Sequence, residues 1–258
     1  MRLGFVGTGA ITSAIVTGLN AAGFGGDTIL VSPRNADTAA ALAAKFPSVT
    51  VAASNQAVLD GSDVVMLAVR PQVATEVLSE IKFRADHHII SLIAITPLEQ
   101  VRAMVAPART VTRAVPLPLV ADRCGPTPIF PSDQTAAGIF NRIGTAIEAT
   151  SADQFSAYCA ATATMAPYFT FAEEIADWLT RHGVPAADAR RYVGTVFQGL
   201  GNIAATTQEH SLAALAGEFA TRGGINEQVV AHMKARGAFD ALSEGLDAVL
   251  QRMKAAAR

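Results

Sequence analysis

The chain opens with a short apolar strand that runs directly into a glycine-rich turn, "GFVGTGAITSA" at residues 4–14. Gly7 permits a tight turn, and Gly9 lets the backbone come close to a ligand. The helix expected next begins with unpaired N–H groups and the positive end of its dipole, which favour a phosphate. Thr12 stands at the third position of G-x-G-x-x-G, so the motif is imperfect. Its place after the first strand nevertheless predicts a dinucleotide site.

Up to about Thr150 the sequence alternates between β-branched runs and stretches with helical spacing. Strands are predicted at residues 2–7, 28–32, 49–52, 63–69, 87–94, 110–115 and 127–130. Such alternation indicates parallel pairing, with helices on both faces of the sheet. The run "VVMLAV" lacks polar alternation, as expected for a strand covered on both sides. We therefore predict an α/β fold with a Rossmann-type dinucleotide-binding domain over residues 1–150.

After Thr150 the pattern becomes helical. Ser151 with Gln154 has the spacing of a capping box, and no convincing strand follows. Residues 186–206 place a broad apolar face on one helix, formed by Val193, Val196, Phe197, Leu200 and Ile203. We predict an all-helical dimerisation domain over residues 151–258. A second copy of the chain is the simplest cover for this face, and packing within one chain is the alternative.

Composition excludes several classes of partner. The formal charge of −2 gives no electrostatic reason to expect nucleic acid or an anionic membrane. No apolar run approaches the roughly 20 residues of a spanning helix. The two cysteines lie far apart and are expected to be reduced and mostly buried, and neither cysteines nor histidines have metal-ligand spacing. We therefore expect no metal site. The N-terminus enters a strand directly, so we also expect no signal peptide and a cytoplasmic protein.

The end of the second strand indicates which dinucleotide binds. An NAD site places Asp or Glu there to accept hydrogen bonds from the ribose. Here the sequence is Ser32, Pro33, Arg34 and Asn35, without a carboxylate. A guanidinium pairs with a 2′-phosphate and a serine hydroxyl can donate to it, so NADP(H) is preferred over NAD(H).

Several segments together resemble the pyrroline-5-carboxylate reductase family, over nearly the whole chain. They are "GFVGTGAITSAI", "VSPRN", "SNQAVLDGSDVVMLAVRPQ", "IISLIA" and the "GG" loop at residues 223–224. The resemblance implies a two-domain NAD(P)H-dependent oxidoreductase acting on CH–NH bonds. Its helical halves would intertwine into a homodimer or a higher homo-oligomer. Its reaction would be reduction of the cyclic imine 1-pyrroline-5-carboxylate to proline, in proline biosynthesis.

The resemblance also implies roles for individual residues. The pyrophosphate would be held by Gly7, Thr8, Gly9, Ala10 and Ile11. Ser32 and Arg34 would hold the adenosine phosphate, and Asn55 would lie near a ribose. The nicotinamide side would be lined by Ala68, Val69, Arg70 and Pro71. The family's S-P-G-G-T-T loop holds the substrate carboxylate, and its match here is Thr221, Arg222, Gly223, Gly224, Ile225 and Asn226.

Three departures from the family pattern fall in the expected substrate pocket. Ile225 and Asn226 replace two threonines, and "VPLPL" at residues 115–119 replaces M-P-N-T-P. "ATATMAPY" at residues 161–168 replaces S-G-S-G-P-A-Y. These changes make the pocket more apolar, and polar groups in a pocket are what discriminate related substrates. Arg222 could clamp a carboxylate if it points inward, or could lie in solvent.

No histidine falls in the candidate pocket segments, and a basic cyclic imine can take its proton from solvent. The protein would therefore contribute positioning, with Asn226 or Thr164 hydrogen bonding to the imine nitrogen. A related reductase for a more apolar imine is an alternative. A β-hydroxyacid dehydrogenase-like enzyme would carry a catalytic lysine on the first helices of its second domain. It is disfavoured here, because the lysines of the second half, Lys234 and Lys254, lie toward the end of the chain. A non-catalytic NADP-binding dimer is the last alternative.

Overall fold

A computed structural model describes residues 1–24 and 28–256. These residues form two compact units. The first contains Met1–Cys159 together with the chain from Arg252 on, and the second contains Ala160–Gln251. The boundary between domains at Thr150 stays a prediction.

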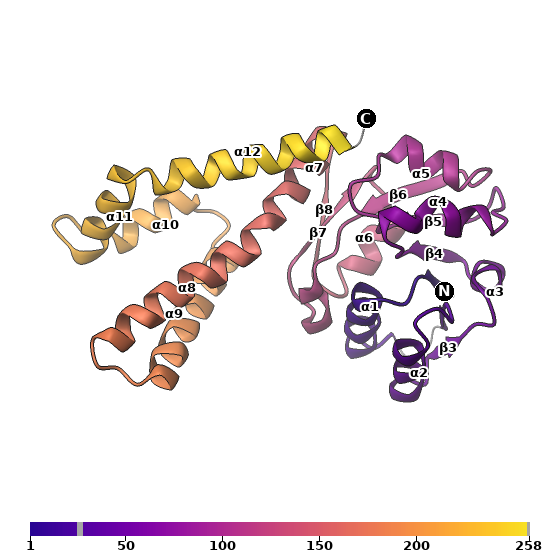
Figure 1. The fold of residues 1–258 in the computed structure, drawn as a ribbon, viewed down its shortest axis with the longest axis horizontal. Helices are drawn as coiled ribbons and strands as arrows, with labels where there is room; N and C mark the ends of the chain where they lie inside the picture. Colours follow the sequence, from indigo (N-terminus) through magenta and orange to yellow (C-terminus); the bar gives the residue numbers. More distant parts are fainter. Residues whose placement is uncertain (25–27, 257–258) are drawn as a thin grey trace. The chain divides into compact units, whose positions relative to one another are not determined.

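The described part of the first unit contains one eight-stranded sheet, ordered β3-β2-β1-β4-β5-β6-β7-β8 (Figure 1). The strands are β1 Leu3–Val6, β2 Ile29–Val31, β3 Val49–Val51, β4 Val64–Leu67, β5 His88–Ser91, β6 Thr110–Ala114, β7 Pro126–Phe130 and β8 Thr145–Glu148. The seven predicted strands are confirmed, and β8 was not predicted. Neighbouring strands are parallel except β6 and β7, which run antiparallel.

Helices cover both faces of this sheet, as predicted (Figure 1). They are α1 Ala10–Ala21, α2 Ala36–Lys45, α3 Asn55–Asp60, α4 Pro71–Ser79, α5 Leu98–Met104, α6 Gln134–Phe140 and α7 Ala152–Ala161, with the 3-10 helix η1 at Pro118–Asp122. In β4, Val64 and Met66 join the core under α1, α2 and α6, whereas Val65 and Leu67 join the core under α3, α4 and α5. This alternation explains why the strand is apolar throughout: both faces are buried.

The strand order reverses between β1 and β4. β2 and β3 lie on one side of β1, and β4 with the later strands lies on the other. In open α/β sheets such a reversal leaves a crevice at the carboxyl ends of the strands, where ligands bind. β1 leads into Gly7 there, and β4 leads into Ala68.

The described part of the second unit is helical, with no strand, as predicted. It contains η2 Thr162–Thr164, α8 Met165–Arg181, α9 Ala186–Thr206, α10 Leu212–Phe219 and α11 Ile225–Ala235, and α12 Ala238–Ala256 runs from it back into the first unit. The predicted N-cap is confirmed before α7, where the Gln154 N–H donates to Ser151 Oγ at 3.1 Å. Gln154 Oε1 in turn accepts from the Thr150 N–H at 3.0 Å.

The second unit exposes large apolar side chains. α8 buries none of its residues, and α9 buries only Ala189 and Val193. The apolar face predicted on α9 is largely uncovered within one chain, since Val196, Leu200 and Ile203 are exposed. Side chains of this size rarely gather on a monomer surface without a partner.

Cys124 is exposed, so the prediction of two mostly buried thiols is wrong for this residue. It lies two residues after the end of η1, in an exposed turn where its Sγ donates to the Leu119 carbonyl at 3.4 Å. Among the described residues, no helix is both long enough and apolar enough to span a bilayer.

Candidate cofactor site and substrate loop

The first glycine turn has the geometry of an anion cradle. Gly7 has φ +103°, and a Cβ at this position would lie 2.5 Å from the Ala68 carbonyl oxygen, so only glycine fits. A Cβ on Gly9 would meet nothing within 4 Å, which leaves open space above the turn. α1 begins directly after Gly9, with no side-chain cap and no acidic residue in its first turn. Its first N–H groups are therefore available to an anion.

Thr12 explains the imperfect motif. Its side chain is fully buried, and Oγ1 donates to the Gly7 carbonyl oxygen at 2.7 Å. A glycine at this position could not make that bond. The threonine therefore stabilises the turn through its hydroxyl group.

Ser32 is bonded to the same turn from the end of β2. Its side chain is fully buried, and Ser32 Oγ accepts from the Gly7 N–H at 3.0 Å. Thr8 Oγ1 donates to the Ser32 carbonyl at 2.7 Å. Ser32 thus fixes the turn against β2 in this structure, and its contact with a cofactor phosphate stays a prediction.

These elements surround a cavity of about 320 Å³ at the β1/β4 crevice. It is lined by Gly7, Thr8, Gly9, Arg34, Asn35, Ala68, Val69, Arg70 and Val73. Two of these residues are arginines and none is acidic, so the lining favours a polyanion. Seven of the residues predicted from the sequence therefore lie together around one cavity.

Asn35 is a lining residue that the sequence analysis did not assign to the site. It adopts the left-handed conformation with φ 65°, and its Nδ2 donates to the Thr8 carbonyl at 3.0 Å. Asparagine tolerates this conformation better than most residues, and its place directly after Arg34 could have indicated the turn. The bond holds the turn before α2 against the glycine loop.

Besides Ser32, four predicted cofactor residues lie outside the cavity lining. Ala10 and Ile11 form the first positions of α1, and Ile11 packs against the core. Asn55 is the first residue of α3, after the cap Ser54. Pro71 is the first residue of α4. Their cofactor roles stay predictions.

The predicted substrate loop lies in the second unit and forms a tight turn before α11. Gly223 has φ +72°, and the Gly224 N–H donates to the Thr221 carbonyl at 2.8 Å. The Gly223 N–H donates to Glu227 Oε2 at 2.6 Å. A carboxylate from α11 itself therefore occupies an amide that was predicted to bind the substrate.

The other predicted substrate residues either donate hydrogen bonds to backbone carbonyls close to them in sequence or are exposed. Asn226 Nδ2 donates to the Phe219 carbonyl at 3.0 Å, and Thr164 Oγ1 donates to the Ala161 carbonyl at 2.8 Å. Arg222 is exposed. Ile225 is 81% exposed, so the residue that replaces a threonine presents its alkyl group to the surroundings of the loop.

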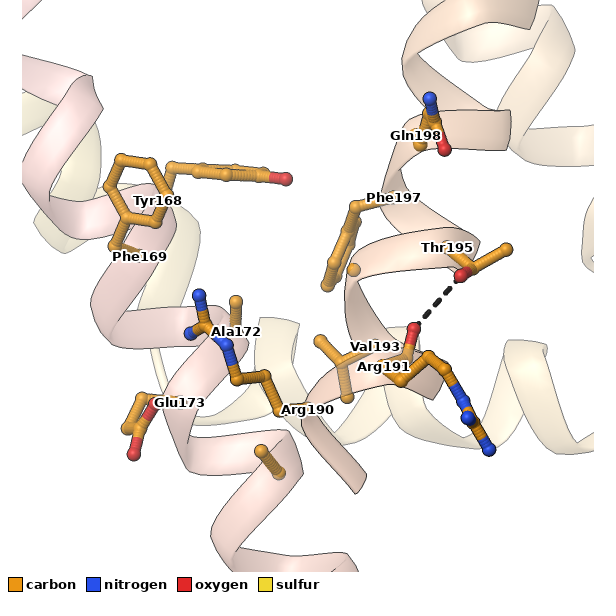
Figure 2. A pocket seen from close by; sticks show the side chains of 12 residues that line it. Tyr168, Phe169, Ala172, Glu173, Arg190, Arg191, Val193, Thr195, Phe197 and Gln198 are labelled. Carbon is orange, nitrogen blue, oxygen red and sulfur yellow. Dashed lines mark hydrogen bonds between the residues drawn. The ribbon is translucent and has the colours of Figure 1, made fainter. Parts of the chain in front are cut away.

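A different cavity, of about 500 Å³, lies between α8 and α9 in the second unit. Figure 2 shows aromatic side chains facing it from both helices, with Tyr168 and Phe197 ring centroids 5.6 Å apart in an edge-to-face arrangement. The dashed line marks Thr195 Oγ1 donating to the Arg191 carbonyl at 2.9 Å. Aromatic side chains are enriched where two protein surfaces pack together, so this lining is typical of a protein–protein interface.

Two family models match the chain. Residues 2–95 match the family described as NADP oxidoreductase coenzyme F420-dependent, and residues 151–256 match pyrroline-5-carboxylate reductase dimerisation. The chain is 27% identical to the pyrroline-5-carboxylate reductase of Escherichia coli over 97% of this chain and 96% of that protein.

Solved structures share the fold. The pyrroline-5-carboxylate reductase of Coxiella burnetii superposes with a TM-score of 0.87 at 23% identity, covering 100% of this chain and 98% of the other. The Plasmodium falciparum pyrroline carboxylate reductase with NADP bound has a TM-score of 0.82 at 17% identity, covering 100% and 98%.

Proposed function

We propose that this chain, which belongs to the pyrroline-5-carboxylate reductase family, uses NADPH to reduce a small cyclic imine, with 1-pyrroline-5-carboxylate as the first candidate. It is an NADP-dependent oxidoreductase of the class that acts on CH–NH bonds. The proposed product, proline, would place it in proline biosynthesis. A cytoplasmic location stays a prediction.

The observation that carries this proposal is the cradle at the β1/β4 crevice. The open space at Gly9 and the uncapped start of α1 fit a pyrophosphate, while Arg34 and Arg70 supply positive charge without a competing acid. Arg34 follows β2, where a 2′-phosphate would be expected. When bound, NADPH would supply the hydride for the imine carbon.

The contribution of the chain's own residues is binding and orientation. We assign Gly7, Thr8 and Gly9 to the pyrophosphate, and Ala68 and Val69 to the wall beside the nicotinamide. In the second unit the loop before α11 would hold the substrate ring. Asn226 donates its Nδ2 proton to Phe219, which leaves its amide oxygen as an acceptor for a protonated imine nitrogen.

One observation favours the second candidate substrate, an uncharged and more apolar cyclic imine. Glu227 already places a carboxylate on the Gly223 N–H, so a substrate carboxylate would meet a like charge there. The exposed Ile225 adds an alkyl surface to the same loop. Arg222 would have to offset Glu227 for a carboxylate to bind.

We also propose that the working form is a homodimer formed by the helical unit. Phe169 is 70% exposed and Tyr192 is 63% exposed, and both lie on the α8–α9 pair. The matched dimerisation family supports assembly through residues 151–256. Covering such side chains is favourable because it removes apolar surface from water.

A panel of cyclic imines and ketones, followed by NADPH absorbance, tests the function. Turnover of 1-pyrroline-5-carboxylate or of uncharged 1-pyrrolines supports the proposal, and their relative kcat/KM separates the two substrates. Turnover of ketones alone contradicts imine reduction. Tight NADPH binding with no oxidation on any substrate would instead indicate a non-catalytic NADP-binding protein.

A further inference from the structure

The first unit contains another cavity, of about 380 Å³, besides the one at the glycine turn. Its lining residues are distant in sequence from that turn. It is bounded by the start of α5, strands β6 and β7, helix α7 and the end of α12. The lining residues that matter here are Arg113, Asp153, Phe155, Cys159, Met253 and Lys254. No residue assigned above to the cofactor or to the imine lines this cavity.

Arg113 is the unusual member of this cavity. It lies on β6 and is only 8% exposed, with its guanidinium carbon 4.5 Å from the centroid of the Phe155 ring. Within residues 1–24 and 28–256, neither a hydrogen bond nor an ion pair reaches its side chain, and Nε is buried without a partner. Arginine stays charged in proteins, so this is a buried cation without a counter-charge.

The charges nearby do not neutralise Arg113. Asp153 Oδ1 lies 3.0 Å from Lys254 Nζ, so these two groups compensate each other. Burial raises the pKa of the Cys159 thiol to about 11, so at neutral pH it is not a thiolate. The cavity therefore carries a net charge of about +1, contributed by Arg113.

The remaining walls are mainly apolar. Ile95, Leu98, Phe130 and Met253 line the cavity beside Phe155. Small-molecule sites combine such walls with a few fixed polar groups, and this cavity falls within their usual size range. A ligand suited to it has an apolar body and a single negative charge.

We propose that this cavity is a binding site for a small organic monocarboxylate, whose two oxygens pair with the guanidinium of Arg113. A planar guanidinium binds a carboxylate through two parallel hydrogen bonds, which would satisfy the unpartnered Nε. Phosphate is disfavoured, because a dianion gains little from one unpaired cation and its remaining oxygens would face the apolar walls. Apolar carbons of the ligand pack against Phe155 and Leu98.

The test uses the full chain and three probes: butyrate, butyramide and inorganic phosphate. Butyrate should raise the Tm by about 3 °C at ten times its Kd. Butyramide and phosphate should not change it. Equal shifts with butyrate and butyramide, a larger shift with phosphate, or no shift with butyrate would each overturn the proposal.

Variants locate the effect. Arg113→Met should abolish the butyrate shift, and its own Tm without ligand should be unchanged or higher, because the unpaired buried charge is gone. Arg109→Met removes an exposed arginine close to the same strand and should keep the full shift. A butyrate shift that survives in Arg113→Met would place the binding elsewhere.

A second variant keeps the test decisive if Arg113→Met does not fold. Arg113→Lys retains the charge but loses the two-pronged geometry, so calorimetry should show butyrate binding about tenfold weaker. An unchanged Kd would contradict the pairing. NADPH affinity, measured on the same variant, should stay within about twofold of the unaltered protein, because the cofactor cavity shares no lining residue with this one. Loss of butyrate binding is thereby distinguished from failure of the proposed reductase function.

Discussion

The N–H of Gly223 donates a 2.6 Å hydrogen bond to the carboxylate of Glu227, four residues further along the chain. Gly224 is the N-cap of α11, and Glu227 is its third residue, so the helix partly caps itself. The same amide is a candidate anchor for the carboxylate of an imine substrate. Glu227 and such a substrate would therefore compete for one donor.

Glu227→Gln should lower the KM for 1-pyrroline-5-carboxylate about tenfold, because the substituted side chain no longer repels the substrate carboxylate. The KM for uncharged 1-pyrroline should stay within about twofold. Steady-state kinetics with both substrates measures this difference.

Glu244→Gln on α12 is the matched control, since it removes an exposed carboxylate outside the loop. It should leave both KM values unchanged. Equal changes for both substrates in Glu227→Gln would mean that the loop does not discriminate substrate charge.

Gly224→Ala should raise the KM for the imine at least about tenfold, with little change in NADPH affinity. The added Cβ would lie 2.9 Å from the Thr221 carbonyl oxygen and 2.6 Å from Thr221 Oγ1, so the loop must shift. Displacements of this kind at a binding site commonly cost tenfold or more in the kinetics.

Gly217→Ala provides the comparison for this substitution. Gly217 lies in α10, and a Cβ there meets nothing within 4 Å. An unchanged KM in Gly224→Ala, with folding intact by circular dichroism, would remove the loop from the substrate site.

Arg34→Glu should weaken NADPH binding about 100-fold and NADH binding by less than about threefold. The substitution replaces a charge-assisted contact to the 2′-phosphate by repulsion, and a factor of 100 corresponds to about 2.7 kcal/mol. Fluorescence titration of both cofactors measures the ratio. Arg109→Glu reverses an exposed charge outside the cavity and should affect neither cofactor strongly. Equal losses for both cofactors would show that Arg34 does not meet the phosphate.

Most of the first unit could be predicted because its signals are local. The β-branched runs identified seven strands, and the glycine turn located the crevice. β8 was not predicted because "TAIE" is four residues long, and its pattern is exposed or half-buried throughout. The antiparallel pairing of β7 with β6 was not predicted either. Strand direction depends on the connection, and here η1 replaces a full crossover helix.

The hydrogen bonds of the candidate site could not be predicted as well as the strands, because the sequence alone does not show which way each side chain points. The sequence did not indicate that the Ser32 hydroxyl accepts a hydrogen bond from the Gly7 N–H. Its contact with a cofactor phosphate stays a prediction. Glu227 lies three residues after the N-cap Gly224, a spacing typical of a capping interaction that could have been recognised. The cavity at Arg113 could not be predicted, because residues of α7 and of the end of α12 line it together with β6 although they lie far from that strand in sequence.

Thr12→Gly restores the third glycine of the motif, but it should destabilise the fold by about 2 kcal/mol. It removes the hydrogen bond to the Gly7 carbonyl and adds the cost of glycine in a helix, about 1 kcal/mol each. Thr12→Ser keeps the hydroxyl and should cost less. Urea unfolding followed by circular dichroism measures both. A Thr12→Gly variant as stable as the unaltered protein would show that the hydroxyl is dispensable.

The combined substitution Phe169→Glu and Tyr192→Glu should convert the proposed homodimer to a monomer. Covering each of these side chains contributes about 1.5–3 kcal/mol, and a two-fold interface counts each one twice. The dimer Kd should therefore rise more than about a hundredfold, as measured by size exclusion with light scattering. Val51→Glu places the same charge on an exposed apolar position of β3 and should leave the dimer intact. A dimer that persists in the double variant would mean that the aromatic face of α8 and α9 is not the contact. Dissociation of the Val51→Glu control would instead place the interface on the sheet unit.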